Sequence, residues 1–330
     1  MTDAIEAKDL VKTYPKDVRA LDGLSFTVEE GSVFGLLGPN GAGKTTVVKI
    51  LTTLSSPDEG EARVAGIDVL RDPDRVRHHI GLVAQKSGVD REATGRENLR
   101  LQGQLYGMRG RDLAERVDWL LERFGLAEAA DRRVKTFSGG MQRRMDIALG
   151  LVHRPRVLFL DEPTTGLDPE VRADMWDMIA GLTREEGLTI LLTTHYLEEA
   201  DRLARNLAIV DRGRVVATGT PEELKAELKG DALHIELADG ANGQVLPTVE
   251  RLPGVREATF EDGELRAWVD HGATAAPAVL AALEGAGMRV QSLTIARPSL
   301  DDVYLRYTGR AFEKADREGE RRGELVGASR

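Results

Sequence analysis

Residues 38–46 read GPNGAGKTT and match the pattern G-x-x-x-x-G-K-[ST]. A short apolar segment, residues 32–37, precedes them and predicts a buried strand, while residues 47–51 predict the start of a helix. Glycines let the backbone turn tightly and approach an anion closely, and the following helix directs its positive dipole end to the same point. The segment therefore predicts a phosphate-binding loop. A chance glycine-rich turn before a helix is the alternative.

Two side chains of this loop have predicted contacts with a nucleotide. Lys44 would reach the β- and γ-phosphates as a point charge, and the Thr45 hydroxyl would ligate Mg²⁺. The candidate nucleotide-binding residues of the loop are Gly38, Pro39, Asn40, Gly41, Ala42, Gly43, Lys44, Thr45 and Thr46.

Length and composition limit what surrounds the loop. The 330 residues are enough for about two domains. A net charge of −10 argues against a general nucleic-acid binder, because such proteins need dense basic patches. The absence of cysteine excludes disulfides, thiolate metal sites and cysteine nucleophiles.

The sequence contains no segment of the kind that enters or crosses a membrane. Residues 1–10 are mixed and acidic, unlike a signal peptide, and no run of 18 or more apolar residues occurs. If the protein acts at a membrane, we expect another chain to span it.

The chain before and after the loop predicts strands beside a main sheet. Residues 1–31 alternate apolar and polar side chains, which favours antiparallel strands. Among them Tyr14 could stack on a nucleotide base, or be an ordinary half-buried strand tyrosine. Residues 60–85 read strand, turn, helix, strand, with Gln85 at the end.

A helical subdomain is predicted to follow, at about residues 86–150. Apolar residues at three- and four-residue spacing fill residues 94–130, and no strand pattern interrupts them. Ser138 can then cap another helix, and Gly139 and Gly140 leave its first N–H groups open to an anion. This predicts a second anion-binding helix start, with a plain helix cap as the alternative.

Two further apolar runs predict buried strands that deliver polar groups. Residues 156–160 end in Asp161 and Glu162, where Asp161 is placed to hold Mg²⁺ and Glu162 to orient or deprotonate a water. Exposed loop acids are the alternative. Residues 188–194 end at His195, which could hydrogen-bond a γ-phosphate or the attacking water, or be a structural histidine.

The last third of the chain predicts a second, smaller domain. Residues 207–217 read as a hairpin, and a helix with a capping box starts at Thr220 and ends at Gly230, where we place the boundary. The order βαββαβ over residues 233–295, with a turn at Asp262-Gly263, matches a ferredoxin-like sandwich. Residues 298–305 add a short helix, and the charged residues 313–330 are expected to be disordered.

Taken together, these residues resemble the ATP-binding cassette of ABC transporters over Ile5 to Lys229. The resemblance implies an α/β fold of the P-loop NTPase class, with a mixed sheet core, an antiparallel β subdomain and a helical subdomain. Residues 230–312 would form the α+β accessory domain. The motifs that match are Walker A through Thr46, Walker B at Val157 to Glu162, the Q-loop at Gln85, the signature at Ser138-Gly139-Gly140, the D-loop at Leu167-Asp168, the H-loop at His195 and the base-stacking Tyr14.

The signature departs from the family pattern Leu-Ser-Gly-Gly-Gln. Phe137 and Met141 stand at its two ends, so one polar contact at a dimer interface is in doubt, and Gln142 is a candidate to replace it. The resemblance implies ATP and Mg²⁺ as ligands, with Thr45, Gln85 and Asp161 at the metal. It also implies a head-to-tail homodimer in which each ATP lies between one copy's phosphate loop and the other copy's signature.

The catalytic residues implied by the family are Lys44, Glu162 and His195, with Asp168 also at the nucleotide interface. Residues 95–99, 105–108 and 298–305 resemble the daunorubicin/doxorubicin-resistance group, whose members work with a separate ABC-2 type membrane subunit. We therefore expect an ATPase on the cytoplasmic face of the membrane that powers export of a drug, antibiotic or other hydrophobic compound.

Two alternatives stay open at this stage. One is the cassette of an importer, in which the C-terminal domain regulates. The other is a soluble cassette protein that remodels ribosomes or DNA, although the chain has a single phosphate loop and no sustained heptads.

Overall fold

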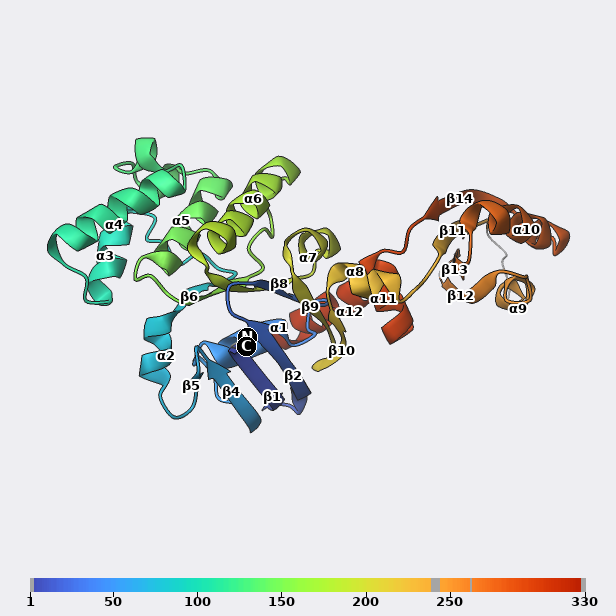
Figure 1. Ribbon diagram of the computed structural model, residues 1–330, viewed down its shortest axis with the longest axis horizontal. Coiled ribbons are helices and arrows are strands. Elements are labelled where there is room, and N and C mark those ends of the chain that lie inside the picture. Colours follow the sequence, from blue (N-terminus) through green and yellow to red (C-terminus); the bar gives the residue numbers. More distant parts are fainter. Residues whose placement is uncertain (1–2, 239–243, 262, 328–330) are drawn as a thin grey trace. The chain divides into compact units, whose positions relative to one another are not determined.

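The computed structural model describes residues 3–238, 244–261 and 263–327. Contacts divide the chain into two compact units, Met1–Gly219 with Ala315–Arg330, and Thr220–Lys314 (Figure 1). The boundary thus lies at Gly219 rather than at the expected Lys229.

A six-stranded sheet forms the centre of the first unit, and all its neighbouring pairs are parallel except β9 and β10. The central strands are buried along their whole length, as expected for parallel strands covered on both faces. In spatial order the strands are β10 (Arg214–Gly219), β9 (Asn206–Asp211), β3 (Val33–Leu37), β8 (Thr189–Thr194), β7 (Val157–Asp161) and β6 (Ile80–Val83).

This strand order brings three predicted segments to one edge of the sheet. The phosphate loop follows β3, Asp161 closes β7, and His195 follows β8. Because β8 lies between β3 and β7, His195 is placed between the phosphate loop and the two acids. Residues far apart in the sequence therefore converge without any long connection.

A four-stranded antiparallel sheet packs beside the main sheet, as the alternation of residues 1–31 predicts. Its order is β2 (Val18–Glu29), β1 (Asp3–Tyr14), β4 (Glu59–Val64) and β5 (Ile67–Asp68). Its buried side chains share one apolar core with α1 (Lys44–Leu51), α2 (Pro73–His79) and one face of the main sheet.

The other face of the main sheet is covered by helices (Figure 1). The predicted helical subdomain is present: α3 (Gly95–Leu105) begins with a capping box at Thr94, and α4 (Gly110–Arg123) and α5 (Gly139–Leu151) follow. Short 3₁₀ turns occupy Ala127–Ala129 and Val134–Thr136. The remaining helices of this face are α6 (Pro169–Glu186) and α7 (Leu197–Leu203).

The second unit has the predicted ferredoxin-like topology, an antiparallel sheet in the order β12-β13-β11-β14. Its elements along the chain are α8 (Pro221–Ala226), β11 (Asp231–Leu237), α9 (Val245–Val249), β12 (Val255–Glu261), β13 (Glu264–Val269), α10 (Gly272–Gly285), β14 (Val290–Ala296) and α11 (Leu300–Thr308). Asp262, half of the predicted turn, lies outside the described residues.

The first helix of this unit differs from its predicted extent. The capping box at Thr220 is present, but α8 ends at Ala226 rather than reaching Gly230. Glu227 follows this helix directly. Its side-chain Oε2 accepts a hydrogen bond from Tyr307 Oη at 2.7 Å, and its backbone carbonyl accepts one from Arg306 Nη1 at 3.2 Å. These contacts join α8 to α11, which explains why the boundary falls before α8.

The prediction of disorder from residue 313 is wrong for the described part of that segment. Phe312–Gly327 form helix α12, and residues 328–330 lie outside the described residues. The charge-rich composition concealed two anchoring positions, because Phe312 and Ala315 are both buried.

Candidate functional site

The phosphate loop has a backbone that only glycine permits at two positions. A Cβ on Gly38 would lie 2.3 Å from the carbonyl oxygen of Val210, and Gly43 has φ +110° directly before α1. Lys44 Nζ donates hydrogen bonds to the carbonyls of Gly38 at 2.6 Å and Pro39 at 3.1 Å. The lysine head group is therefore held over its own loop.

Asp161 lies at the end of β7 and faces the loop. Its Oδ1 accepts hydrogen bonds from Thr193 Oγ1 at 2.6 Å and from Thr45 Oγ1 at 3.4 Å. Oxygen ligands of this kind suit Mg²⁺. The two predicted metal-binding residues Thr45 and Asp161 are thus brought together.

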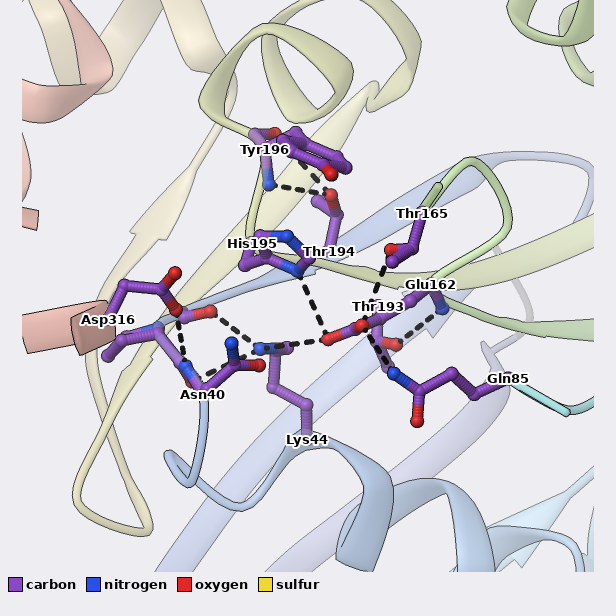
Figure 2. Close-up of polar contacts among 12 residues, drawn as sticks. Asn40, Lys44, Gln85, Glu162, Thr165, Thr193, Thr194, His195, Tyr196 and Asp316 are labelled. Atoms are coloured by element: carbon purple, nitrogen blue, oxygen red, sulfur yellow. Dashed lines mark hydrogen bonds and ion pairs between the residues drawn. The ribbon is translucent and has the colours of Figure 1, made fainter. Parts of the chain in front are cut away.

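The Glu162 side chain contacts three of the predicted site residues (Figure 2). Its Oε1 lies 3.6 Å from Lys44 Nζ and 3.3 Å from His195 Nδ1, and its Oε2 accepts a hydrogen bond from Gln85 Nε2 at 3.0 Å. Its backbone has φ +49° and donates N–H to Thr193 Oγ1 and to the Thr193 carbonyl, each at 3.1 Å. Strained backbone of this kind, held by its neighbours, is typical of functional positions.

Burial and charge pairing act in opposite directions on the pKa values of Lys44 and Glu162. Burial raises the pKa of Glu162, but the hydrogen bond from His195 and the charge of Lys44 outweigh this and hold that pKa below its ordinary value. Burial also lowers the pKa of Lys44, against the opposing charges of Glu162, Asp316 and Asp161. A carboxylate whose pKa is lowered is deprotonated at neutral pH, which is the state in which it can accept a proton.

The amide nitrogen of Gln85 donates a hydrogen bond to Glu162 Oε2, and the role of this residue as a metal ligand stays a prediction. The segment that follows is tied to α5, because Asp146 accepts hydrogen bonds from Ser87 Oγ at 2.9 Å and Gly88 N–H at 3.0 Å. The Q-loop position therefore connects the Glu162 carboxylate with the helical subdomain.

Two residues of the site were missed by the sequence analysis. Thr193 holds both Asp161 and the Glu162 backbone, and a threonine inside an apolar strand carries no pattern that signals this. Arg143 is buried on α5 and donates hydrogen bonds to four carbonyls, which no motif signalled. These acceptors are the carbonyl oxygens of Ala84, Asp161, Glu162 and Pro163.

The predicted second anion site lies at the start of α5. Ser138 Oγ accepts the N–H of Met141 at 3.3 Å, so the serine caps the helix as predicted. A Cβ on Gly140 would lie 2.6 Å from Cγ1 of Val171, which requires glycine there. Gln142 Nε2 donates to the Phe137 carbonyl at 3.0 Å.

The remaining predicted residues lie on other elements. Tyr14 is partly buried at the end of β1, with Lys12 Nζ 5.9 Å from its ring centroid. Asp168 caps α6 by accepting the N–H of Val171 at 3.0 Å. Both contacts are compatible with a purely structural use, and the ligand roles of these two residues stay predictions.

The fold and the site define a P-loop nucleotide-binding cassette, and comparison with known proteins defines its family. The family model described as ABC transporter matches residues 21–165, and the one described as ATP-binding protein DrrA1-3-like, C-terminal domain, matches residues 219–308. The chain belongs to the ATP-binding proteins of ABC transporters, and like them it is an ATPase.

Characterised relatives match along nearly the whole chain. It is 46% identical to the daunorubicin resistance ATP-binding protein DrrA2 of Streptomyces coeruleorubidus, over 95% of this chain and 97% of that protein. It is 45% identical to the daunorubicin/doxorubicin resistance ATP-binding protein DrrA of Streptomyces peucetius, over 93% of each. It is also 42% identical to the Nod factor export ATP-binding protein I of a Rhizobium species, over 94% of this chain and 99% of that protein.

Solved structures resemble the cassette part. That of cbiO1 from Clostridium perfringens, part of an ABC transporter complex, has a TM-score of 0.64 and 28% identity, covering 69% of this chain and 92% of the other. A dimeric ATP-binding cassette bound to ADP and phosphate has a TM-score of 0.60 and 27% identity, covering 66% and 98%. Among the described residues, we find no helix long and apolar enough to cross a membrane.

Proposed function

We propose that this chain binds ATP on residues 38–46 and hydrolyses it with Glu162 as the base. The observation that supports this most strongly is the position of the Glu162 carboxylate, between Lys44, His195 and Gln85 at the edge of the sheet where the phosphate loop also ends. Lys44 would turn from its loop carbonyls to the β- and γ-phosphates. Tyr14 would stack on adenine.

Each of the surrounding residues has a distinct task in this proposal. Glu162 would orient a water in line with the γ-phosphate and accept its proton, and His195 would hold the water or the transferred phosphate. Thr193 would fix Asp161 and the Glu162 backbone during the reaction. Mg²⁺, which neutralises phosphate charge when bound, would be held by Thr45, Asp161 and the side-chain oxygen of Gln85.

We further propose that the site is completed by a second copy of the chain. Ser138, Gly139 and Gly140 open a helix whose first N–H groups suit a phosphate, yet their contacts in this chain are with their own helix and with Val171. The resemblance to a dimeric cassette supports a pair of copies, and we propose that the pair is head-to-tail, so that these residues and Asp168 would meet the partner's nucleotide.

The biological use that we propose is export of a hydrophobic compound through a separate ABC-2 type permease. Relatives named for daunorubicin resistance and for Nod factor export match both units of the chain, which supports export over import. The protein would then act as a peripheral subunit on the cytoplasmic face of the membrane.

Transport by inverted membrane vesicles tests this proposal. Vesicles that contain the protein and its ABC-2 type permease should accumulate daunorubicin only when ATP is added, and the Glu162→Gln variant should abolish this accumulation. ATP-driven accumulation that persists in the variant would contradict the catalytic assignment. Absence of ATP-driven daunorubicin movement, in vesicles whose wild-type ATPase is active, would contradict the assigned cargo class.

A further inference from the structure

Helix α12 contacts the phosphate loop through a negatively charged side chain. The Asn40 backbone N–H, inside the loop, donates a hydrogen bond to Asp316 Oδ1 at 2.7 Å (Figure 2). Asp316 belongs to the part of α12, from Ala315 on, that groups with the nucleotide-binding unit. A carboxylate on a backbone N–H of this loop makes the kind of contact that a phosphate oxygen makes.

The backbone of α12 is also fitted to the loop. A Cβ on Gly319 would lie 1.7 Å from the Asn40 carbonyl oxygen, and a Cβ on Gly41 would lie 3.8 Å from the Gly319 Cα. Glycine is unfavourable inside a helix compared with alanine. Its presence at residue 319 is explained by this close approach, because any side chain there would push the helix off the loop.

The charge of Asp316 reaches the catalytic lysine as well. It is among the negative charges that oppose the lowering of the Lys44 pKa by burial. A nucleotide phosphate brings negative charge to the same groups, and Asp316 and a phosphate would repel each other if both were present. The contact of Asp316 with the Asn40 N–H and this repulsion therefore make α12 and nucleotide compete for the loop.

We propose that α12 is an autoinhibitory plug, in which Asp316 and Gly319 seat the helix on the phosphate loop and nucleotide must displace it. The inference rests on the proposed nucleotide site. One carboxylate competes with the several phosphate oxygens of ATP, so the plug is weak and raises the concentration of ATP needed to fill the site.

Binding of a fluorescent ATP analogue to the full-length chain tests the plug. Asp316→Asn removes the charge at nearly constant shape, and Gly319→Ala strengthens the helix while blocking the close approach. Each should lower the apparent Kd by a factor of up to about ten, the order expected for one charge-assisted hydrogen bond. Glu313→Gln, an exposed position on the same helix, removes the same charge and should leave the Kd unchanged.

A Lys44→Ala variant separates failure of the plug from failure of the site. If binding depends on Lys44 while Asp316→Asn and Gly319→Ala match Glu313→Gln, the plug is overturned and the nucleotide site stands. If binding is independent of Lys44, both are overturned. Hydrogen exchange gives a second readout: backbone amides of residues 315–319 should exchange faster when ATP is added to the wild-type chain, and unchanged exchange would contradict displacement.

Discussion

Two helix starts in this chain are built from similar sequences but differ in what surrounds them. The start of α1 follows a glycine-rich loop and lies among Lys44, Asp161, Glu162 and His195, all of which contact one another or the loop. The start of α5 also carries glycines, yet its contacts are a serine cap and apolar neighbours. The start of α1 is therefore surrounded by groups that can bind charge or exchange a proton. In our proposal the start of α5 contributes only its backbone N–H groups and Ser138 to an anion bound by the other copy.

The largest effect should come from a change among the charged residues around the start of α1. Glu162→Gln removes the proposed base while nearly keeping the side-chain shape, and we expect steady-state ATP hydrolysis to fall by a factor of about 10² or more. ATP-analogue binding should survive. Phosphate release at the wild-type rate would show that Glu162 is not the base, and that the two helix starts differ less than their surroundings indicate.

Arg143 connects the surroundings of the two helix starts, since it lies on α5 and donates hydrogen bonds to carbonyls at the end of β7. Arg143→Gln removes the guanidinium that donates hydrogen bonds to four carbonyls, and the free energy of unfolding should fall by about 2–3 kcal/mol. Arg144→Gln is the matched control on the next residue, where a surface ion pair with Asp174 is lost and the change should stay within about 0.5 kcal/mol. Urea unfolding of both variants checks this. Equal losses of unfolding free energy in the two variants would mean that Arg143 does not hold α5 to the end of β7.

The smallest effect concerns pH. The pKa of Glu162 is lowered in the folded protein, so its contribution to stability is present above the unfolded-state pKa and is lost as pH falls through the folded-state pKa. The difference in unfolding free energy between wild type and Glu162→Gln should therefore be constant from neutral pH down to the ordinary value of 4.5 and change in disfavour of the wild type below it. A change of that difference near neutral pH would contradict the lowered pKa.

Most of the charged residues around the start of α1 could be predicted from the sequence, because buried parallel strands bring their carboxyl ends to one edge of the sheet. The phosphate loop, Asp161, Glu162 and His195 follow from that rule. Thr193 and Arg143 do not, since a threonine in an apolar strand and an arginine on an amphipathic helix have no distinguishing pattern. The topology of the second unit followed from its order of strands and helices.

Helix α12 could not be predicted from composition alone. Composition reports the average of a segment, whereas the helix has two buried positions, Phe312 and Ala315, among residues that are mostly charged or glycine. The extent of α8 was also overestimated, because its packing on α11 is a tertiary contact that the local capping pattern does not contain.

The difference between the two helix starts leads to one decisive experiment, in which two defective copies are mixed. Lys44→Ala disables the first start. Ser138→Asp keeps a good helix cap at the second while placing a negative charge against phosphate, and Ser138→Asn is its uncharged control. In a one-to-one mixture half of the dimers are mixed and each holds one intact site, so roughly a quarter of the wild-type ATPase rate should return. A mixture as inactive as either variant alone would contradict a site shared between two copies.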